Sequence, residues 1–269
     1  MSGIAQLMRV SGIDAIDARA LLRATLAVDD AYLIAHATDE IAAQHEAQFR
    51  ALAARRVVGE PVAYIVGERE FYGHAFKVTP AVLIPRPETE LLVELALQHR
   101  PQQVLDLGTG SGCIAISIAL AQPVAQVVAL DRSAPALVVA RENAARLKVR
   151  NVTFQTSDWF DAINKQRFEL IVSNPPYVAE GDAHLSQGDL RFEPAAALAS
   201  GADGLADIRI IVSGAHAHLK PGGWLLLEHG YDQALRCRAL LEQTRLREVQ
   251  SWRDLAGIER VSGRRLRSL

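Results

Sequence analysis

The chain has 269 residues, of which 49% are hydrophobic and 22% charged, and its formal net charge is −2 at pH 7. This composition is that of an ordinary globular protein of one or two domains, and the charge gives no overall attraction to nucleic acid or to an anionic membrane. Two cysteines exclude a disulfide framework and a zinc site of four cysteines. No apolar run reaches the roughly 18 residues of a membrane span, and the N-terminus lacks a secretory signal. We therefore expect a cytoplasmic protein without a bound metal.

The first quarter of the chain has helical periodicity. Apolar residues follow helical spacing from Ile13 to Leu26, and an alanine-rich run extends from Thr38 to Arg56. The helices are expected to end near Gly59-Glu60-Pro61. We interpret residues 1–75 as a small helical domain whose function is either packing alone or the docking of a partner.

Residues 76–90 are interpreted as a hairpin and connector. Aromatic residues between Arg69 and Val78 flank Gly73-His74, which predicts a β-hairpin with a tight turn. Pro85 and Pro87 then fix an extended segment, and Pro87 suits the first turn of a helix that runs to about His99.

From Gln103 onward strands alternate with helices, as in an α/β domain. The strand Val104-Leu105-Asp106-Leu107 is followed by Gly108-Thr109-Gly110-Ser111-Gly112 and a helix that begins near Cys113. Alternating glycines let the backbone approach a ligand, and the helix N-terminus favours an anionic group. The second strand, Gln126 to Leu130, ends at Asp131, which follows the glycines by about 20 residues and is suited to bind two ribose hydroxyls.

The glycine spacing favours a single nucleoside rather than a dinucleotide. The order is Gly-x-Gly-x-Gly, an acid (Asp106) precedes the glycines, and the lysine of a phosphate-binding loop is missing. A nucleoside with an amino-acid tail, such as S-adenosylmethionine, fits this pattern. After a third strand at Asn151 to Phe154, Asp158 could accept from the adenine amino group while Trp159 lies against the ring. The alternative is a loop whose aromatic side chains fill the core.

A fourth strand, Leu170 to Val172, stops at Asn174-Pro175-Pro176-Tyr177. The prolines cannot donate to a sheet and favour extended geometry, so a stiff tetrapeptide follows the strand's carboxyl end, where ligands bind in open α/β sheets. The Asn174 side-chain oxygen and the Pro175 carbonyl could accept the two hydrogens of a planar NH2 group, with Tyr177 as an aromatic wall. The alternative is a strand-ending turn with a packed tyrosine.

The remaining elements complete the sheet. A helix is expected near Ile208 to Leu219, ended by Lys220-Pro221-Gly222-Gly223, and a fifth strand at Trp224 to Glu228. Two more strands are expected within Leu246 to Leu269. We interpret Glu228 and His229 as a packed strand-end pair without a catalytic role.

The chain resembles the class I methyltransferases and, among them, the release factor glutamine methyltransferases. Asn-Pro-Pro-Tyr alone is shared with nucleic-acid methyltransferases, but its combination with the proline-rich connector and the helical N-terminal segment is far more specific. One departure is Phe192, where the family often has tyrosine. The segments similar to the family's signatures are Pro85-Arg86-Pro87-Glu88-Thr89-Glu90, Asp106 to Gly112, Asn174 to Tyr177, Glu193-Pro194 through Gly201 to Leu205, and Leu219 to Gly223.

This resemblance implies a Rossmann-like domain at residues 91–269 with a mostly parallel seven-stranded sheet, preceded by a small helical bundle. It implies methyl transfer from S-adenosylmethionine to the glutamine amide nitrogen in the Gly-Gly-Gln loop of peptide chain release factors, which the helical domain would help to dock. The expected site residues are Asn174, Pro175 and Tyr177 for catalysis; Gly108, Thr109, Gly110, Ser111, Gly112, Asp131, Asp158, Trp159 and Asn174 for the cofactor; and Asn174, Pro175, Pro176, Tyr177 and Arg86 for the substrate.

Two other functions are compatible with parts of the pattern. A nucleic-acid methyltransferase would apply the same Asn-Pro-Pro-Tyr chemistry to the exocyclic amine of a flipped base. It normally needs a basic surface, and the near-neutral charge gives no sign of one, so direct nucleic-acid binding is not expected. A non-catalytic S-adenosylmethionine-binding protein would explain the glycines but not the two acceptors.

Overall fold

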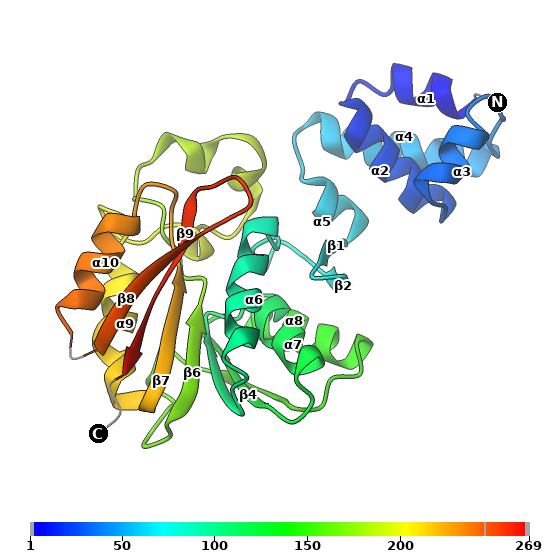
Figure 1. Ribbon diagram of the computed structural model, residues 1–269. Coiled ribbons are helices and arrows are strands. Elements are labelled where there is room, and N and C mark those ends of the chain that lie inside the picture. The colour runs from blue at the N-terminus through cyan, green and yellow to red at the C-terminus, as the bar shows by residue number, and fades with distance from the viewer. Residues whose placement is uncertain (1–2, 245, 267–269) are drawn as a thin grey trace. The chain divides into compact units, whose positions relative to one another are not determined.

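The computed structural model describes residues 3–244 and 246–266. The chain forms two compact units: the first extends to Glu68 and includes Gly188–Phe192, and the second comprises Arg69–Gln187 and the chain from Glu193 onward (Figure 1). The expectations for residues 1–2 and 267–269 lie outside the described part. Within that part, no helix combines the length and the apolar character needed to cross a membrane.

The first unit is helical. Leu7, Leu21, Leu22 and Phe49 are almost fully buried and form its core. The helical periodicity predicted only the two long helices, and the helical region does not end near Gly59 as expected, because a short helix follows Pro61. Short helices show too few turns for periodicity to reveal them. The helices are α1 Ile4–Val10, α2 Ala15–Leu26, α3 Asp30–Ala35, α4 Ala43–Val57 and α5 Val62–Val66.

A short segment from late in the chain, the 3-10 helix η3 Gly188–Phe192, belongs to this helical unit. Arg56 holds it by donating to Asp17 at 2.6 Å and to Asp189 at 2.7 Å. Arg191 donates to the carbonyl of Val58 at 2.6 Å. No local sequence pattern indicates this association, because the partners are more than 130 residues apart.

The second unit contains a seven-stranded sheet in the order β5-β4-β3-β6-β7-β9-β8. Strand β9 is antiparallel to β7 and β8, and the remaining pairs are parallel. The strand order reverses between β3 and β6, so the crevice at their carboxyl ends is where a ligand is expected. The strands are β3 Gln103–Leu107, β4 Gln126–Asp131, β5 Val152–Thr156, β6 Phe168–Ser173, β7 Leu219–Glu228, β8 Leu246–Arg253 and β9 Glu259–Leu266.

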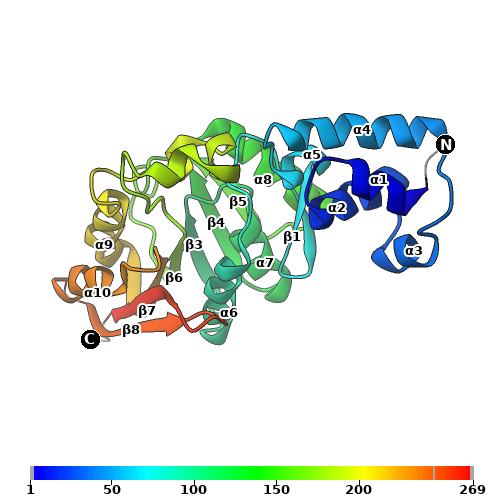
Figure 2. The same ribbon diagram turned by 90° about the horizontal axis from the view of Figure 1, so that it is seen from above.

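Helices cover both faces of this sheet (Figures 1 and 2). Val104 of β3 faces a core with α6 Glu90–Gln98 and α7 Cys113–Ala121, beside which lies α8 Ala134–Arg146. Its neighbour Leu105 faces the other core, with α9 Ala206–His218 and α10 Ala234–Glu242. Successive side chains of a strand point to opposite faces, so an apolar run is buried on both. Three short elements precede the sheet in the sequence. The predicted hairpin consists of β1 Glu68–Phe71 and β2 His74–Lys77, and the 3-10 helix η1 Pro87–Thr89 follows it.

One expected boundary is wrong. The Lys-Pro-Gly-Gly segment does not separate a helix from a strand at Trp224, because β7 begins at Leu219 and includes it, with a register shift against β6. A Cβ on Gly223 would lie 3.0–3.1 Å from backbone oxygens of Phe168, Glu169 and Lys220. Glycine is therefore needed for close approach to β6 rather than to end a helix.

Candidate active site

The glycine loop after β3 has the backbone geometry that requires glycine. Gly108, Gly110 and Gly112 have φ angles of +74°, +56° and +82°. Gly108 and Gly110 line a cleft, whereas a Cβ on Gly112 would come within 2.9 Å of Ile116 Cδ1 and 3.2 Å of Ala140 Cβ. The first two glycines thus shape the cleft, and Gly112 allows α7 and α8 to pack closely.

Asp131, at the end of β4, anchors this loop. One carboxylate oxygen accepts from the Gly110 N–H and the other from the Ser133 N–H, both at 2.8 Å. Burial raises the pKa of Asp131, and these two backbone hydrogen bonds oppose the shift. Each carboxylate oxygen can accept more than one hydrogen bond, so Asp131 retains acceptor capacity for ribose hydroxyls.

Asp106 lies fully buried beneath the loop. Its Oδ2 accepts from the Thr109 hydroxyl at 2.6 Å, while its Oδ1 has no partner among the described residues. Burial raises the pKa of Asp106 to about 7. The Thr109 hydroxyl and the backbone N–H of Ala115 favour the ionised form and oppose this shift.

The cleft lies at the carboxyl ends of β3, β4 and β6. Seven of the expected site residues line it: Gly108, Gly110, Asp131, Asp158, Trp159, Asn174 and Pro176. Residues without a specific sequence prediction also line it: Ala81, Leu130, Arg132, Ser133, Ala136, Ser157, Pro194, Ala196 and Ala197. Its glycine backbone, two carboxylates and indole ring suit a nucleoside with an amino-acid tail, so the residues present fit the expected S-adenosylmethionine.

Trp159 is held in a fixed orientation at one side of the cleft. Its indole N–H donates to Asp207 at 3.2 Å, and its ring lies about 3.5 Å from where a Cβ on Gly108 would be. Its φ of +39° is unusual for a bulky residue and stores backbone strain. Among the described residues no donor contacts the Asp158 carboxylate, which leaves it available to a ligand.

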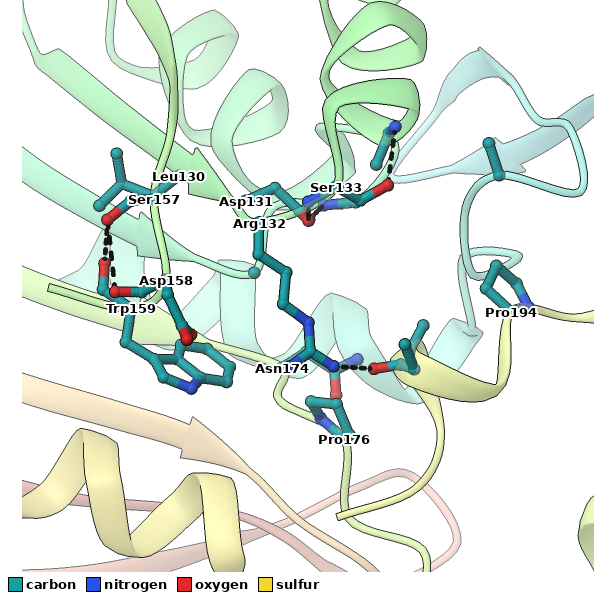
Figure 3. A pocket seen from close by; sticks show the side chains of 16 residues that line it. Leu130, Asp131, Arg132, Ser133, Ser157, Asp158, Trp159, Asn174, Pro176 and Pro194 are labelled. Atoms are coloured by element: carbon teal, nitrogen blue, oxygen red, sulfur yellow. Dashed lines mark hydrogen bonds between the residues drawn. The ribbon is translucent and has the colours of Figure 1, made fainter. Parts of the chain in front are cut away.

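Arg132 is a cleft residue that sequence reasoning missed. Figure 3 shows its side chain extending from the side of Asp131 toward Asn174. Its guanidinium donates to the carbonyl of Ala196 at 3.1 Å. The only sequence signal was its position directly after Asp131.

Asn174 and Pro175 provide two acceptors at the end of β6. The preceding Ser173 donates to the carbonyl of Leu107 at 2.7 Å, which ties β6 to the start of the glycine loop. Asn174 Nδ2 donates to the Thr89 hydroxyl at 3.1 Å. No hydrogen bond between described residues ends on Asn174 Oδ1 or on the Pro175 carbonyl. Both oxygens therefore lack a hydrogen-bond donor within the described part of the chain.

Tyr177 and Pro175 do not line the cleft wall. Pro175 is buried, and the hydroxyl of Tyr177 donates to Glu228 at 3.4 Å. Burial, followed by the negative charge of Glu228, raises the pKa of Tyr177, which stays protonated. The Tyr177 carbonyl accepts from Gln233 Nε2 at 2.9 Å. Tyr177 is thus held from both its ring and its backbone.

Other expected site residues do not line the cleft but form hydrogen bonds and ion pairs that stabilise the segments around it. Arg86 forms an ion pair with the buried Glu193, which also accepts from the Ile84 N–H at 3.0 Å. Ser111 is buried, and its carbonyl accepts from Asn143 at 2.9 Å. Arg86 thereby joins the connector to the Glu193-Pro194 segment that borders the cleft.

Comparison with known proteins agrees with this geometry. Residues 87–203 match the family described as methyltransferase small domain, and residues 2–67 match the PrmC N-terminal domain. A methyltransferase from Pyrococcus furiosus has a TM-score of 0.58 at 18% identity, over 80% of this chain and 98% of that one. The T. thermophilus 16S rRNA N2 G1207 methyltransferase, solved with AdoMet and guanosine, has a TM-score of 0.56 at 24% identity, over 74% and 50%. Fold and site together define a class I methyltransferase, as expected.

Curated relatives show to which family of class I methyltransferases the chain belongs. The release factor glutamine methyltransferase of Bordetella pertussis is 54% identical over 268 residues, which cover 98% of this chain and 99% of that protein. The protein of the same name from Neisseria gonorrhoeae is 48% identical over 257 residues, or 94% of each chain. The chain belongs to the release factor glutamine methyltransferase family.

Proposed function

We propose that the protein transfers a methyl group from S-adenosylmethionine to the side-chain amide nitrogen of the glutamine in the Gly-Gly-Gln loop of a peptide chain release factor. The names of the relatives support this substrate. The observation that carries the proposal is the position of Asn174, which lines the nucleoside cleft and whose Oδ1, like the carbonyl of the next residue Pro175, accepts no hydrogen bond from a described residue.

Different cleft residues are proposed to bind different parts of the cofactor. The glycine loop would hold its amino-acid tail, Asp131 would accept from its ribose hydroxyls, and Asp158 with Trp159 would bind its adenine. When bound, S-adenosylmethionine supplies an electrophilic methyl group, and S-adenosylhomocysteine is the product.

The two acceptors address the main difficulty of the reaction, which is the weak nucleophilicity of an amide nitrogen. Asn174 Oδ1 and the Pro175 carbonyl each accept one hydrogen of the glutamine NH2, which orients the nitrogen toward the methyl group. Such positioning supplies roughly 7–11 kcal/mol of a barrier in favourable cases. Both oxygens also stabilise the positive charge that develops as the nitrogen–carbon bond forms and the sulfur–carbon bond breaks. The methylated amide then loses a proton to water or to a backbone carbonyl.

A transfer assay with labelled cofactor and purified release factor tests the proposal. We expect label in the wild-type factor and none in a factor whose Gly-Gly-Gln glutamine is replaced by alanine. We expect Asn174→Ala to lower single-turnover transfer by about 100-fold, the scale of one oriented charge-stabilising group, with cofactor affinity nearly unchanged. Label in nucleic acid instead of release factor would overturn the proposed substrate, and a fully active Asn174→Ala would overturn the role of the acceptors.

The helical unit is proposed to dock the release factor. Its surface exposes several large apolar side chains, namely Val10, Ile16, Ile34, Val57 and Val58, which could contact a protein partner. We expect Ile16→Ser to raise KM for the release factor several-fold without changing cofactor affinity. Val124→Ser is the matched control, because Val124 is equally exposed, at 77% against 78%, but lies in the other unit. Equal KM values for the two variants would argue against docking at Ile16.

A further inference from the structure

A buried asparagine of α8 reaches the glycine loop although it does not line the cleft. Asn143 is 0% exposed. Its Nδ2 donates to the carbonyl of Ser111 at 2.9 Å and to the carbonyl of Lys77 at 3.0 Å. Its Oδ1 accepts from the Lys77 N–H at 2.7 Å. Both amide hydrogens and the amide oxygen of Asn143 therefore have backbone partners.

These partners determine how the carboxamide of Asn143 is oriented. A carbonyl oxygen can only accept, so the carbonyls of Ser111 and Lys77 must face the NH2 group, and the Lys77 N–H must face the oxygen. A reversed carboxamide would set its oxygen against two carbonyl oxygens and its NH2 group against an N–H. Asn143 is therefore a fixed link between Lys77, 66 residues earlier, and Ser111, 32 residues earlier.

The peptide group between Ser111 and Gly112 is held on both sides. This planar group carries the Ser111 carbonyl on one side and the Gly112 N–H on the other. That N–H donates to a carbonyl within the same loop at 2.8 Å, while the carbonyl accepts from Asn143. The Gly110 N–H donates to Asp131 at 2.8 Å. The loop is thus fixed from two elements, by Asn143 of α8 and by Asp131 of β4.

Asn143 also lies on the side of α8 that is turned toward the cleft. Ala136, two helical turns earlier, lines the cleft, and Ala140 packs against the last glycine of the loop. These three positions follow the helical spacing i, i+4 and i+7, so they share one side of the helix. The chain after Lys77 leads to Ala81, which also lines the cleft. Asn143 therefore joins the glycine loop to the segment that leads to a second part of the cleft wall.

We propose that Asn143 is a positioning residue for the cofactor, because it holds the glycine loop in its ligand-binding conformation before S-adenosylmethionine binds. This inference rests on the proposed binding of that cofactor in the cleft, but not on the identity of the methyl acceptor. Without Asn143 the buried Ser111 carbonyl would lack a donor, so the loop would adopt other arrangements in which this carbonyl meets water. Only the fraction of molecules with the ordered loop then binds the ligand, and the apparent dissociation constant rises in proportion.

Calorimetric binding of S-adenosylhomocysteine, which has no methyl group to transfer, tests the inference in the full-length protein. We expect Asn143→Ala to raise the dissociation constant about tenfold, the scale of one lost hydrogen bond. Single-turnover transfer at saturating S-adenosylmethionine should stay at the wild-type rate, because the bound ligand restores the loop and Asn174 is unchanged. A variant that was merely unstable would not separate affinity from rate in this way.

Asn151→Ala is the matched control. Asn151 Nδ2 also donates to backbone carbonyls, those of Ala119 at 3.1 Å and Ala125 at 3.0 Å, but at the other end of α7. This variant should lower the free energy of unfolding in urea without changing the affinity for S-adenosylhomocysteine. Wild-type affinity in Asn143→Ala, or equal weakening of binding by the two variants, would overturn the inference.

If Asn143→Ala fails to fold, hydrogen exchange in the wild-type protein decides. The side-chain NH2 group of Asn143, assigned by NMR, should exchange slowly without ligand and equally slowly with S-adenosylhomocysteine, because its hydrogen bonds are already formed. Fast exchange that slows only when the ligand binds would overturn the inference. Wild-type protein that does not bind S-adenosylhomocysteine would instead refute the proposed cofactor cleft.

Discussion

Gly204 is the residue whose substitution the structure predicts most sharply. Its φ is +72°, and an alanine Cβ would lie 2.3 Å from the carbonyl oxygen of Tyr177 and 2.8 Å from Gln233 Nε2. Gln233 donates to that same Tyr177 carbonyl at 2.9 Å and accepts from the Gly230 N–H at 2.9 Å. Gly204→Ala would therefore displace the Gln233 side chain, whose hydrogen bond to the Tyr177 carbonyl fixes the backbone of the Asn-Pro-Pro-Tyr segment.

The magnitude follows from two costs. A side chain in left-handed backbone geometry costs roughly 1–2 kcal/mol. Displacing Gln233 leaves the half-buried Tyr177 carbonyl without its donor, which costs about 1–3 kcal/mol more, and the overlap of the new Cβ with the Tyr177 backbone oxygen adds to this. We expect Gly204→Ala to lower the free energy of unfolding by at least about 3.5 kcal/mol, the sum of the middle values of the two costs.

Gly181→Ala isolates the first cost. Gly181 has a φ of +84°, but an added Cβ would meet no atom within 4 Å. It should lose only about 1–2 kcal/mol by equilibrium urea denaturation and keep its transfer rate. Gly204→Ala should in addition transfer methyl groups more slowly, because Tyr177 and its neighbours shift. Equal stability losses, or an active Gly204→Ala, would refute the view that Gly204 is required for close packing against Tyr177.

Three other substitutions have definite expected outcomes. Asp131→Ala should weaken S-adenosylmethionine binding at least tenfold, because it removes a ribose acceptor and releases the glycine loop; unchanged affinity in calorimetry would contradict this. Arg132→Ala should speed cofactor association and dissociation in stopped-flow fluorescence if its bond to Ala196 must open for entry; unchanged rates would exclude this. The pKa of Glu228 rises from 4.5 to about 7 on folding, so its contribution to stability is present below pH 4.5 and lost as the pH rises to 7. Glu228→Gln should remove about 3 kcal/mol of that pH dependence in urea denaturation, and an unchanged slope would contradict the assigned burial.

Local patterns predicted the parts of the fold that depend on local geometry. The glycine loop, the acid at the end of β4 and the tetrapeptide after β6 each occupy a strand terminus. The mostly parallel seven-stranded sheet is confirmed, and its strand order, which was not predicted, brings all three to one crevice. The individual roles assigned to these residues stay predictions. Helices α8 and α10 were not specified, and Lys-Pro-Gly-Gly was placed outside the strand that contains it.

What the sequence could not supply was contact between distant segments. Arg132 meets Ala196, 64 residues later, and Asn174 meets Thr89, 85 residues earlier. Glu228 was interpreted as a packed strand-end residue, and its burial agrees with that, but its proximity to Tyr177 required the sheet register. Such pairs leave no periodic signal because each residue type is ordinary at its own position.

The placement of Gly188–Phe192 with the N-terminal helices bears on how this protein can diversify or be engineered. The helical unit is encoded by two separate stretches, and the second lies two residues before Pro194 at the cleft. A chimaera that exchanged only the first 68 residues with a relative would separate Arg56 from the Asp189 with which it was inherited. The N-terminal helices therefore cannot be exchanged on their own without losing this ion pair. A chimaera that keeps the ion pair must take both stretches from the same parent protein.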